Sequence, residues 1–199
     1  MIGIIDYGSG NFGSVYNAVS TISSSIKTIT KPEDFSEVSH IILPGVGSFL
    51  GAMKKIQDLN LINELEKNVL ELKKPYLGIC VGMQILANEG LEFGSHKGLG
   101  WVEAKVEELN NERLPHVGWN EIEIAKKISI LEGIEDKATF YFVNSFAIKK
   151  VNDESVAAYT DYEEPFISVI QKENIFGVQF HPEKSQDYGL QLLQNFINL

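Results

Sequence analysis

An apolar run passes into a helical pattern at the chain's only cysteine, in Tyr76-Leu77-Gly78-Ile79-Cys80-Val81-Gly82. The run Tyr76–Cys80 predicts a buried strand, and the pattern over Val81–Ala87 predicts a helix. A glycine on each side of the cysteine lets the backbone bend sharply and keeps other side chains away from it. The stretch therefore has the strand–turn–helix form of the nucleophile elbow G-x-S-x-G, with cysteine in place of serine.

Cys80 has two interpretations. In an elbow its thiol projects at a helix N-terminus, where the helix dipole favours the thiolate, and the Val81 amide can stabilise an oxyanion. The alternative is a buried structural cysteine, which is the usual fate of a lone cysteine. The flanking glycines Gly78 and Gly82 favour the nucleophile.

Strand and helix signals alternate through the first half of the chain. This alternation predicts an α/β fold with a central, mostly parallel sheet flanked by helices, of flavodoxin-like type. The strands are expected at 2–5, 26–30, 41–43 and 76–80, and helices at the apolar repeats Val15–Ile22 and Leu61–Leu72.

The second half is richer in short strands with turn residues between them. Such runs predict hairpins, or antiparallel strands added to the edge of the central sheet. Glu103–Arg113 is highly charged and predicts a solvated loop or hairpin, and Tyr188–Ile197 predicts a closing helix. The strands are expected at 101–106, 121–124, 139–143, 155–159, 167–170 and 175–180.

Length and composition predict a single globular domain over residues 1–199, with 44% hydrophobic and 22% charged residues. The net charge of −10 argues against nucleic acid or an anionic membrane as the main partner, because both require clustered Lys and Arg. One cysteine excludes an internal disulfide framework. We see no targeting or membrane-spanning segment, and we expect a cytoplasmic protein.

A second chemical motif follows the apolar strand near the C-terminus, at Phe180-His181-Pro182-Glu183-Lys184. Glu183 is close enough to hold one ring nitrogen of His181, which leaves the other nitrogen to face a thiol as a base. The alternative is a solvated charged loop. A metal site is disfavoured because the other histidines are isolated, so we predict neither metal nor cofactor.

Two glycine-rich loops follow predicted strands. Pro44-Gly45-Val46-Gly47 can supply a second oxyanion donor through its backbone amides, or can be a plain β-turn. The loop Gly8–Gly13 formally reads G-x-G-x-x-G, but Asp6 and Tyr7 separate it from the strand, which argues against a dinucleotide site. A tight turn facing a ligand or partner is the preferred interpretation.

Two weaker candidates lie outside these motifs. Gln84 follows Cys80 by four residues on the same helix face, where it can hold a substrate or cap local backbone. The segment Pro115–Asn120 predicts a compact aromatic turn, and its Trp119-Asn120 pair suits either an interface or a structural role.

Together these segments resemble the class I, triad-type glutamine amidotransferases, and more closely the glutaminase subunits of imidazole glycerol phosphate synthases. The resemblance runs through nearly the whole chain. The cysteine elbow and the His181-Pro182-Glu183 signature are specific to the class. The subfamily is indicated by Ile5–Asn11, Leu43–Gly47 and Pro115–Asn120.

The resemblance implies hydrolysis of glutamine to glutamate and ammonia without a cofactor. Cys80 is implied as the nucleophile, His181 as the base and Glu183 as the group that orients it. The implied oxyanion site comprises Val81, Gly45, Val46 and Gly47, and the implied glutamine site comprises Gln84, Asn144, Ser145 and Phe146.

The resemblance also implies a heterodimer with a (β/α)8-barrel synthase subunit. That subunit receives the ammonia and forms imidazole glycerol phosphate and aminoimidazole carboxamide ribotide in histidine biosynthesis. The positions implied at the interface are Asn11, Trp119, Asn120 and Lys184.

The sequence departs from the family pattern at three positions. Asn144 and Phe146 stand where the family usually carries His and Tyr, and Trp101 stands where an aliphatic residue is commoner. These departures keep open a paralogous subunit that supplies ammonia to a surface-polysaccharide sugar precursor. A catalytically silent scaffold and a cysteine hydrolase acting alone are further alternatives.

Overall fold

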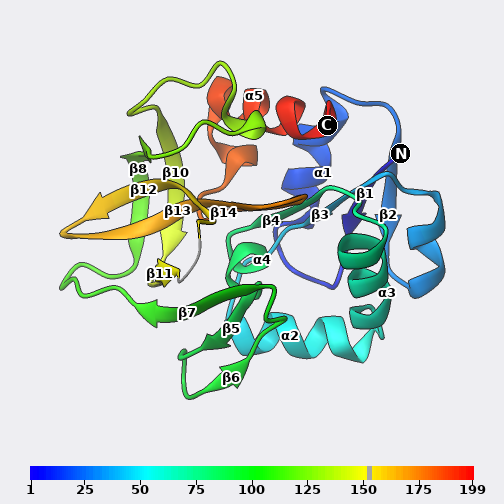
Figure 1. The fold of residues 1–199 in the computed structure, drawn as a ribbon, viewed down its shortest axis with the longest axis horizontal. Coiled ribbons are helices and arrows are strands. Elements are labelled where there is room, and N and C mark those ends of the chain that lie inside the picture. The colour runs from blue at the N-terminus through cyan, green and yellow to red at the C-terminus, as the bar shows by residue number, and fades with distance from the viewer. Residues whose placement is uncertain (152–153) are drawn as a thin grey trace.

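The structure is a computed structural model that describes residues 1–151 and 154–199 (Figure 1). Its first half alternates strands and helices, as the sequence predicts. The elements in order are β1 Ile2–Ile5, α1 Phe12–Ser20, β2 Ile26–Ile29, a 3-10 helix Pro32–Glu37, β3 His40–Leu43, α2 Phe49–Asp58, α3 Ile62–Glu66 with a π-helical turn Lys67–Glu71, β4 Tyr76–Ile79 and α4 Val81–Gln84.

The second half is mainly antiparallel strands and closes with a long helix. The elements are β5 Ala87–Gly90, β6 His96–Lys97, β7 Val102–Glu108, β8 His116–Glu121, β9 Glu123–Ile124, a 3-10 helix Ser129–Leu131, β10 Thr139–Asn144, β11 Phe146–Val151, β12 Val156–Tyr162, β13 Glu164–Lys172, β14 Ile175–Val178, a 3-10 helix Pro182–Lys184 and α5 Gln186–Ile197.

The central sheet has eight strands in the order β2-β1-β3-β4-β14-β13-β12-β9. Its neighbours from β2 to β14 pair in parallel, and β13, β12 and β9 extend it in antiparallel fashion. The predicted α/β fold, mostly parallel with added antiparallel strands, is therefore confirmed. Strands β8 and β10 form a separate pair, and β11-β7-β5-β6 form a third sheet.

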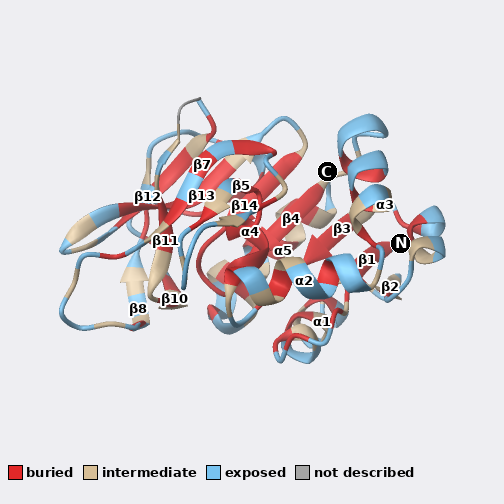
Figure 2. Ribbon diagram, turned by 90° about the horizontal axis from the view of Figure 1, so that it is seen from below, coloured by how far each residue is buried: buried red, intermediate tan, exposed pale blue. Residues whose placement is uncertain are grey.

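Helices cover both faces of the parallel part of the sheet. In Figure 1, α1 and α5 lie on one side and α2 and α3 on the other. Strands β1, β4 and β14 are buried along their whole length, as Figure 2 shows in red. Burial on both faces explains why these strands carry continuous apolar runs rather than alternating ones.

The carboxyl ends of β1, β3, β4 and β14 meet at one edge of the sheet. The register sets Leu43 beside Gly78 and Ile79 beside Val178. The residues that follow each strand therefore gather at this edge, which is where open α/β sheets bind ligands.

Two expectations about the elbow region and the aromatic segment were wrong. The helix predicted over Val81–Ala87 ends at Gln84, because the Leu86 carbonyl instead accepts from the Trp101 amide at 2.9 Å and Ala87 begins β5. The segment Pro115–Asn120 is not a compact turn. From His116 it is strand β8, paired in antiparallel register with β10.

Other boundaries also differ from the sequence prediction. The charged segment Glu103–Arg113 begins inside β7, whose even-numbered residues 102, 104 and 106 are buried while the charged ones face out. The strand expected at 121–124 is interrupted at Ile122, which is fully buried. Leu72 is 57% exposed, so it lies outside the buried face that Leu65 and Val69 form.

Helix α2 was not predicted, although its signals are present. Ser48 is its N-cap, and the Ser48 side chain accepts from the Gly51 amide. Phe49, Ala52 and Ile56 form its buried face. In the described chain, no helix is both long and apolar enough to cross a bilayer.

Replacing Gly82 with alanine tests the close packing of α4 against β3. A Cβ at Gly82 would lie 2.0 Å from the Leu43 carbonyl oxygen, so the backbone must move. We expect the free energy of unfolding to fall by about 3 kcal/mol in urea denaturation. Gly13→Ala is the matched control, because a Cβ there meets open space in the described structure and alanine favours helix α1. Equal stability of the two variants would contradict this packing.

Candidate active site

Cys80 occupies a strained turn between β4 and α4. Its backbone has φ 54° and ψ −110°, a left-handed φ that a residue with a side chain rarely adopts. A Cβ at Gly78 would lie 2.3 Å from the Gly82 carbonyl oxygen, so the turn leaves no room for a side chain there. The two glycines are thus required by close backbone approach, and the predicted elbow is present.

The His181–Glu183 pair lies just beyond β14, at the same edge of the sheet. Nδ1 of His181 and Oε1 of Glu183 are 2.8 Å apart, and both side chains are fully buried. The His181 amide donates to the Tyr141 carbonyl at 2.8 Å, and the Ser185 hydroxyl donates to the His181 carbonyl at 2.6 Å. The alternative of a solvated charged loop is therefore wrong.

The second ring nitrogen of His181 is directed at the cysteine. Nε2 has no hydrogen-bond partner among the described residues, and it lies near enough to Cys80 for the sulfur to affect its protonation. Burial lowers the pKa of His181, but the neighbouring Cys80 and Glu183 outweigh it and raise the pKa to about 10. The His181 imidazole is therefore protonated at neutral pH.

Asn11 contacts the same carboxylate oxygen of Glu183 as His181 does. The sequence resemblance implies a partner interface for Asn11, but its side chain is 3% exposed. Its Nδ2 donates to Oε1 of Glu183 at 2.8 Å and lies 3.3 Å from Nδ1 of His181. The turn after β1 therefore contacts the His181–Glu183 pair through Asn11, and the partner contact that the resemblance implies for Asn11 stays a prediction.

The Gly45–Gly47 segment follows β3 and borders the cysteine. Gly47 has φ +111°, which only glycine adopts readily. Val46 and Gly47 line a cavity together with Cys80 and Val81. Gly45 lies behind them, where a Cβ would meet the Tyr7 hydroxyl at 2.3 Å. The Val81 amide belongs to the first helical turn, which has no acceptor of its own for it.

This cavity has a volume of about 350 Å³ and suits a small amino acid. Gln84 and the segment Asn144-Ser145-Phe146 also line this cavity. Glu92 also lines it, and its Oε2 accepts from the Phe49 amide at 2.8 Å. Sequence reasoning missed Glu92 because no motif surrounds it. Its carboxylate adds an acidic group to the lining of this cavity.

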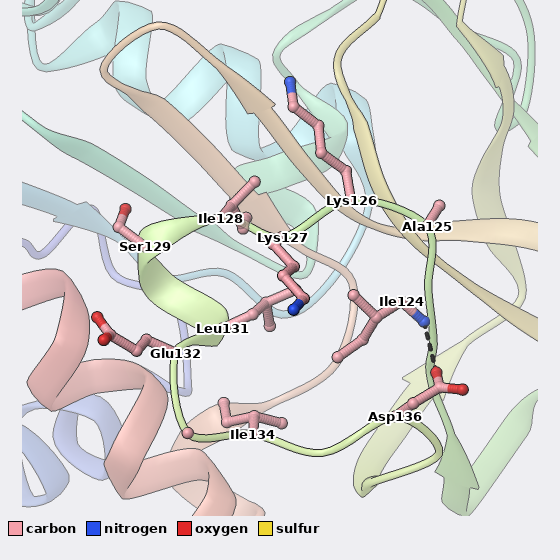
Figure 3. A pocket seen from close by; sticks show the side chains of 11 residues that line it. Ile124, Ala125, Lys126, Lys127, Ile128, Ser129, Leu131, Glu132, Ile134 and Asp136 are labelled. Atoms are coloured by element: carbon pink, nitrogen blue, oxygen red, sulfur yellow. Dashed lines mark hydrogen bonds between the residues drawn. The ribbon is translucent and has the colours of Figure 1, made fainter.

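A larger cavity of about 820 Å³ lies between residues 124 and 136 (Figure 3). Apolar side chains such as Ile124, Leu131 and Ile134 line it together with polar ones, among them the exposed Lys126 and Lys127. The lining includes none of the predicted catalytic residues. The smaller cavity is therefore the candidate active site, because Cys80 lines it.

The remaining residues predicted at an interface lie on the strand pair β8–β10 and after β14. Trp119 is 48% exposed and packs edge-on against Tyr141, and the Lys184 ammonium lies 5.8 Å from the centre of the Tyr141 ring. Asn120 is half-buried and donates to the Asp161 carbonyl at 2.8 Å. Trp119 and Lys184 thus lie on either side of Tyr141, the residue of β10 whose carbonyl accepts from the His181 amide.

Metal ligation has no evident basis in this site. Among residues 1–151 and 154–199, no three His, Cys, Asp or Glu side chains converge in a way that could hold a metal ion. The arrangement instead provides a thiol, a base with its orienting carboxylate, and backbone donors. Such a set attacks a carbonyl carbon and stabilises the resulting oxyanion.

Comparison with known proteins identifies the class. The family model for class-I glutamine amidotransferases matches residues 3–199, and the chain belongs to that family. A solved structure of a glutamine amidotransferase superposes with a TM-score of 0.78 at 21% identity, covering 100% of this chain and 99% of the other. The chain is therefore a class-I glutamine amidotransferase, and the solved structure shows the same fold.

Curated relatives are more specific. The chain is 46% identical to imidazole glycerol phosphate synthase subunit HisH 1 of Campylobacter jejuni strain RM1221, with 100% of both chains covered. It is 41% identical to imidazole glycerol phosphate synthase subunit HisH of Pelagibacter ubique, with 98% of both covered. These relatives are named as subunits of a synthase, and none of the names points to a surface-sugar pathway.

The protonation of His181 predicts how stability depends on pH. The pKa of His181 is about 10 in the folded chain, against 6.5 when unfolded. Its contribution is complete below pH 6.5, declines as the pH rises, and is lost above pH 10, because the folded state keeps a proton that the unfolded state releases. We therefore compare the free energy of unfolding of the unmodified protein with that of His181→Asn. The difference between the two should fall as the pH rises from 6.5 to 10.

Glu183→Gln serves as the control for this measurement. It removes the Glu183 carboxylate, one of the two neighbours that raise the pKa of His181, so the decline should end at a lower pH than in the unmodified protein. A stability difference that stayed constant or grew between pH 6.5 and pH 10 would show that His181 is not held in its protonated form.

The Asn11 contact predicts an effect on turnover. Asn11→Ala removes the donor to Glu183 and leaves a buried carboxylate with less support, so His181 is oriented less well. We expect glutamine turnover to fall by about tenfold. Asn17→Ala, on the outer part of helix α1, is the control and should be close to the unmodified protein. Full activity of Asn11→Ala would show that the contact with Glu183 does not contribute to turnover.

Proposed function

We propose that this chain, as a single amidotransferase domain, hydrolyses L-glutamine to L-glutamate and ammonia with Cys80 as nucleophile. One observation carries the proposal. The only cysteine lies in a strained elbow, lines a small cavity and faces a fully buried His–Glu pair. Neither a structural cysteine nor a surface loop requires that combination.

The reaction divides into two steps at the sulfur. The Cys80 thiolate attacks the side-chain carbonyl carbon of glutamine, and the tetrahedral intermediate collapses to a thioester as ammonia leaves with a proton from His181. Water then attacks the thioester, with His181 as the base, and releases glutamate and the thiol. Glu183 keeps the imidazole in the required orientation and stabilises its protonated form.

The cavity walls supply the remaining requirements. The Val81 amide and the Gly45–Gly47 backbone stabilise the negative oxygen of the intermediate. Glu92 pairs with the α-ammonium of glutamine, and the backbone of residues 144–146 contacts the rest of the substrate. Because that contact is through backbone, Asn144 and Phe146 are compatible with the chemistry.

The ammonia passes to a synthase subunit rather than to solvent. The names of the curated relatives support an assembly of this kind. We infer a cytoplasmic heterodimer with a (β/α)8-barrel subunit, which forms imidazole glycerol phosphate in histidine biosynthesis. The exposed Trp119 and Lys184, with the half-buried Tyr141 between them, offer the aromatic and cationic contacts expected of such an interface.

Cys80→Ser tests the division of labour between the subunits. In the complex with the barrel subunit, glutamine-driven synthesis should fall by at least a thousandfold, since a serine hydroxyl is a far weaker nucleophile beside this base. Synthesis from added ammonium salt should persist, because the synthase site lies on the other subunit. The measurement is formation of the aminated product, with the unmodified complex as control.

Three results would contradict parts of the proposal. Equal loss of ammonium-driven synthesis would show that Cys80 serves both reactions. Glutamine turnover that ignored the barrel subunit would favour a hydrolase acting alone. An aminated sugar in place of imidazole glycerol phosphate would overturn the pathway and leave the glutaminase chemistry standing.

A further inference from the structure

We infer that Gln179 is a positioning residue that holds the Cys80 sulfur in its thiolate form through an N–H···S hydrogen bond. Gln179 is fully buried, although it lies in an otherwise apolar run at the end of β14. Its Nε2 lies 3.6 Å from the Cys80 sulfur, within hydrogen-bond range for a sulfur acceptor. The mechanism above gives this side chain no role, so its burial has to be explained.

Strand register brings the two side chains together. Val178 of β14 pairs with Ile79 of β4, so the next residues, Gln179 and Cys80, are neighbours at the sheet edge. The Cys80 amide donates to the Val178 carbonyl at 2.8 Å, which fixes this relationship through the backbone. Gln179 is therefore held beside the sulfur by the central sheet rather than by a loop.

The direction of the hydrogen bond follows from its neighbours. The Phe146 carbonyl can only accept, so the Gln84 atom 2.8 Å from it must be the amide nitrogen. That same nitrogen lies 3.0 Å from the Gln179 side chain, which must therefore present its oxygen. The remaining Gln179 group, the NH₂, is the one directed at the sulfur. A backbone carbonyl thus sets the polarity of the whole chain of hydrogen bonds.

A fixed donor at the sulfur discriminates between its two protonation states. A thiolate accepts strongly from an N–H, whereas a neutral thiol accepts only weakly. The Val143 carbonyl oxygen of β10 lies 3.9 Å from the sulfur, and it can accept a hydrogen bond only from the neutral thiol. Gln179 therefore opposes that form and, together with protonated His181, keeps the sulfur ready to attack.

The test is alkylation of the full chain by iodoacetamide between pH 5 and pH 10, followed by intact mass. Cys80 is the only cysteine, so every adduct reports on this sulfur. The inference rests on the proposed function, but the neutral reagent does not depend on glutamine binding. In Gln179→Glu, whose carboxylate cannot donate, we expect alkylation at pH 7 to slow by about ten- to a hundredfold. The rate should recover at alkaline pH.

Matched variants separate a donor from a packing effect. Gln179→Met keeps the side-chain length without the N–H and adds no charge, so it should shift the profile in the same direction as Gln179→Glu but by less. Gln84→Met frees the Gln179 amide to rotate and should give a smaller loss than Gln179→Met. Gln191→Met, on the exposed side of α5, should leave the profile unchanged. A shift of the half-maximal rate to higher pH supports the inference. An unchanged profile, or a loss that is equal at every pH, overturns it.

The failure of this inference is distinct from failure of the proposed function. If the unmodified protein, with its synthase subunit bound, turns over glutamine while the Gln179 variants keep the original alkylation profile, only the role of Gln179 is wrong. If the unmodified complex does not turn over glutamine at all, the proposed function fails.

Discussion

The parallel pairing of β4 with β14 is the constraint on which the site depends. These strands are about a hundred residues apart in sequence, yet their register sets Ile79 beside Val178. The residues that follow each strand then leave the sheet at the same edge. A shift of this register would carry Gln179 and His181 away from the sulfur together, while leaving each local motif intact. The site is thus a property of the sheet, and the loops supply only its walls.

Backbone strain at Cys80 is compatible with this sheet because the surrounding packing determines the turn. Gly78 and Gly82 approach neighbouring carbonyl oxygens so closely that only hydrogen fits. The left-handed φ of Cys80 follows from that packing and projects the thiol out of the strand. Strain of this kind persists where many contacts enforce it, which is common at reactive residues.

Sequence reasoning predicted the features that have a local signature. The parallel core, the elbow, and the pairing of His181 with Glu183 all follow from runs or spacings a few residues long. It failed where a distant segment decides the outcome. The end of α4 is set by hydrogen bonds to residues near Trp101, and the role of Asn11 depends on a contact with Glu183 across the fold. Gln179 did carry a signal, since a polar residue inside an apolar strand run requires a buried partner.

The Phe146 carbonyl has a consequence for how this chain can vary. It accepts from Gln84 and, at 3.2 Å, from the Asn144 side chain, so position 146 contributes main chain to the site. A change of side chain there leaves the acceptor in place. The phenylalanine at position 146, which departs from the family pattern, therefore keeps the carbonyl acceptor that Gln84 and Asn144 use, so this departure by itself does not indicate a different chemistry.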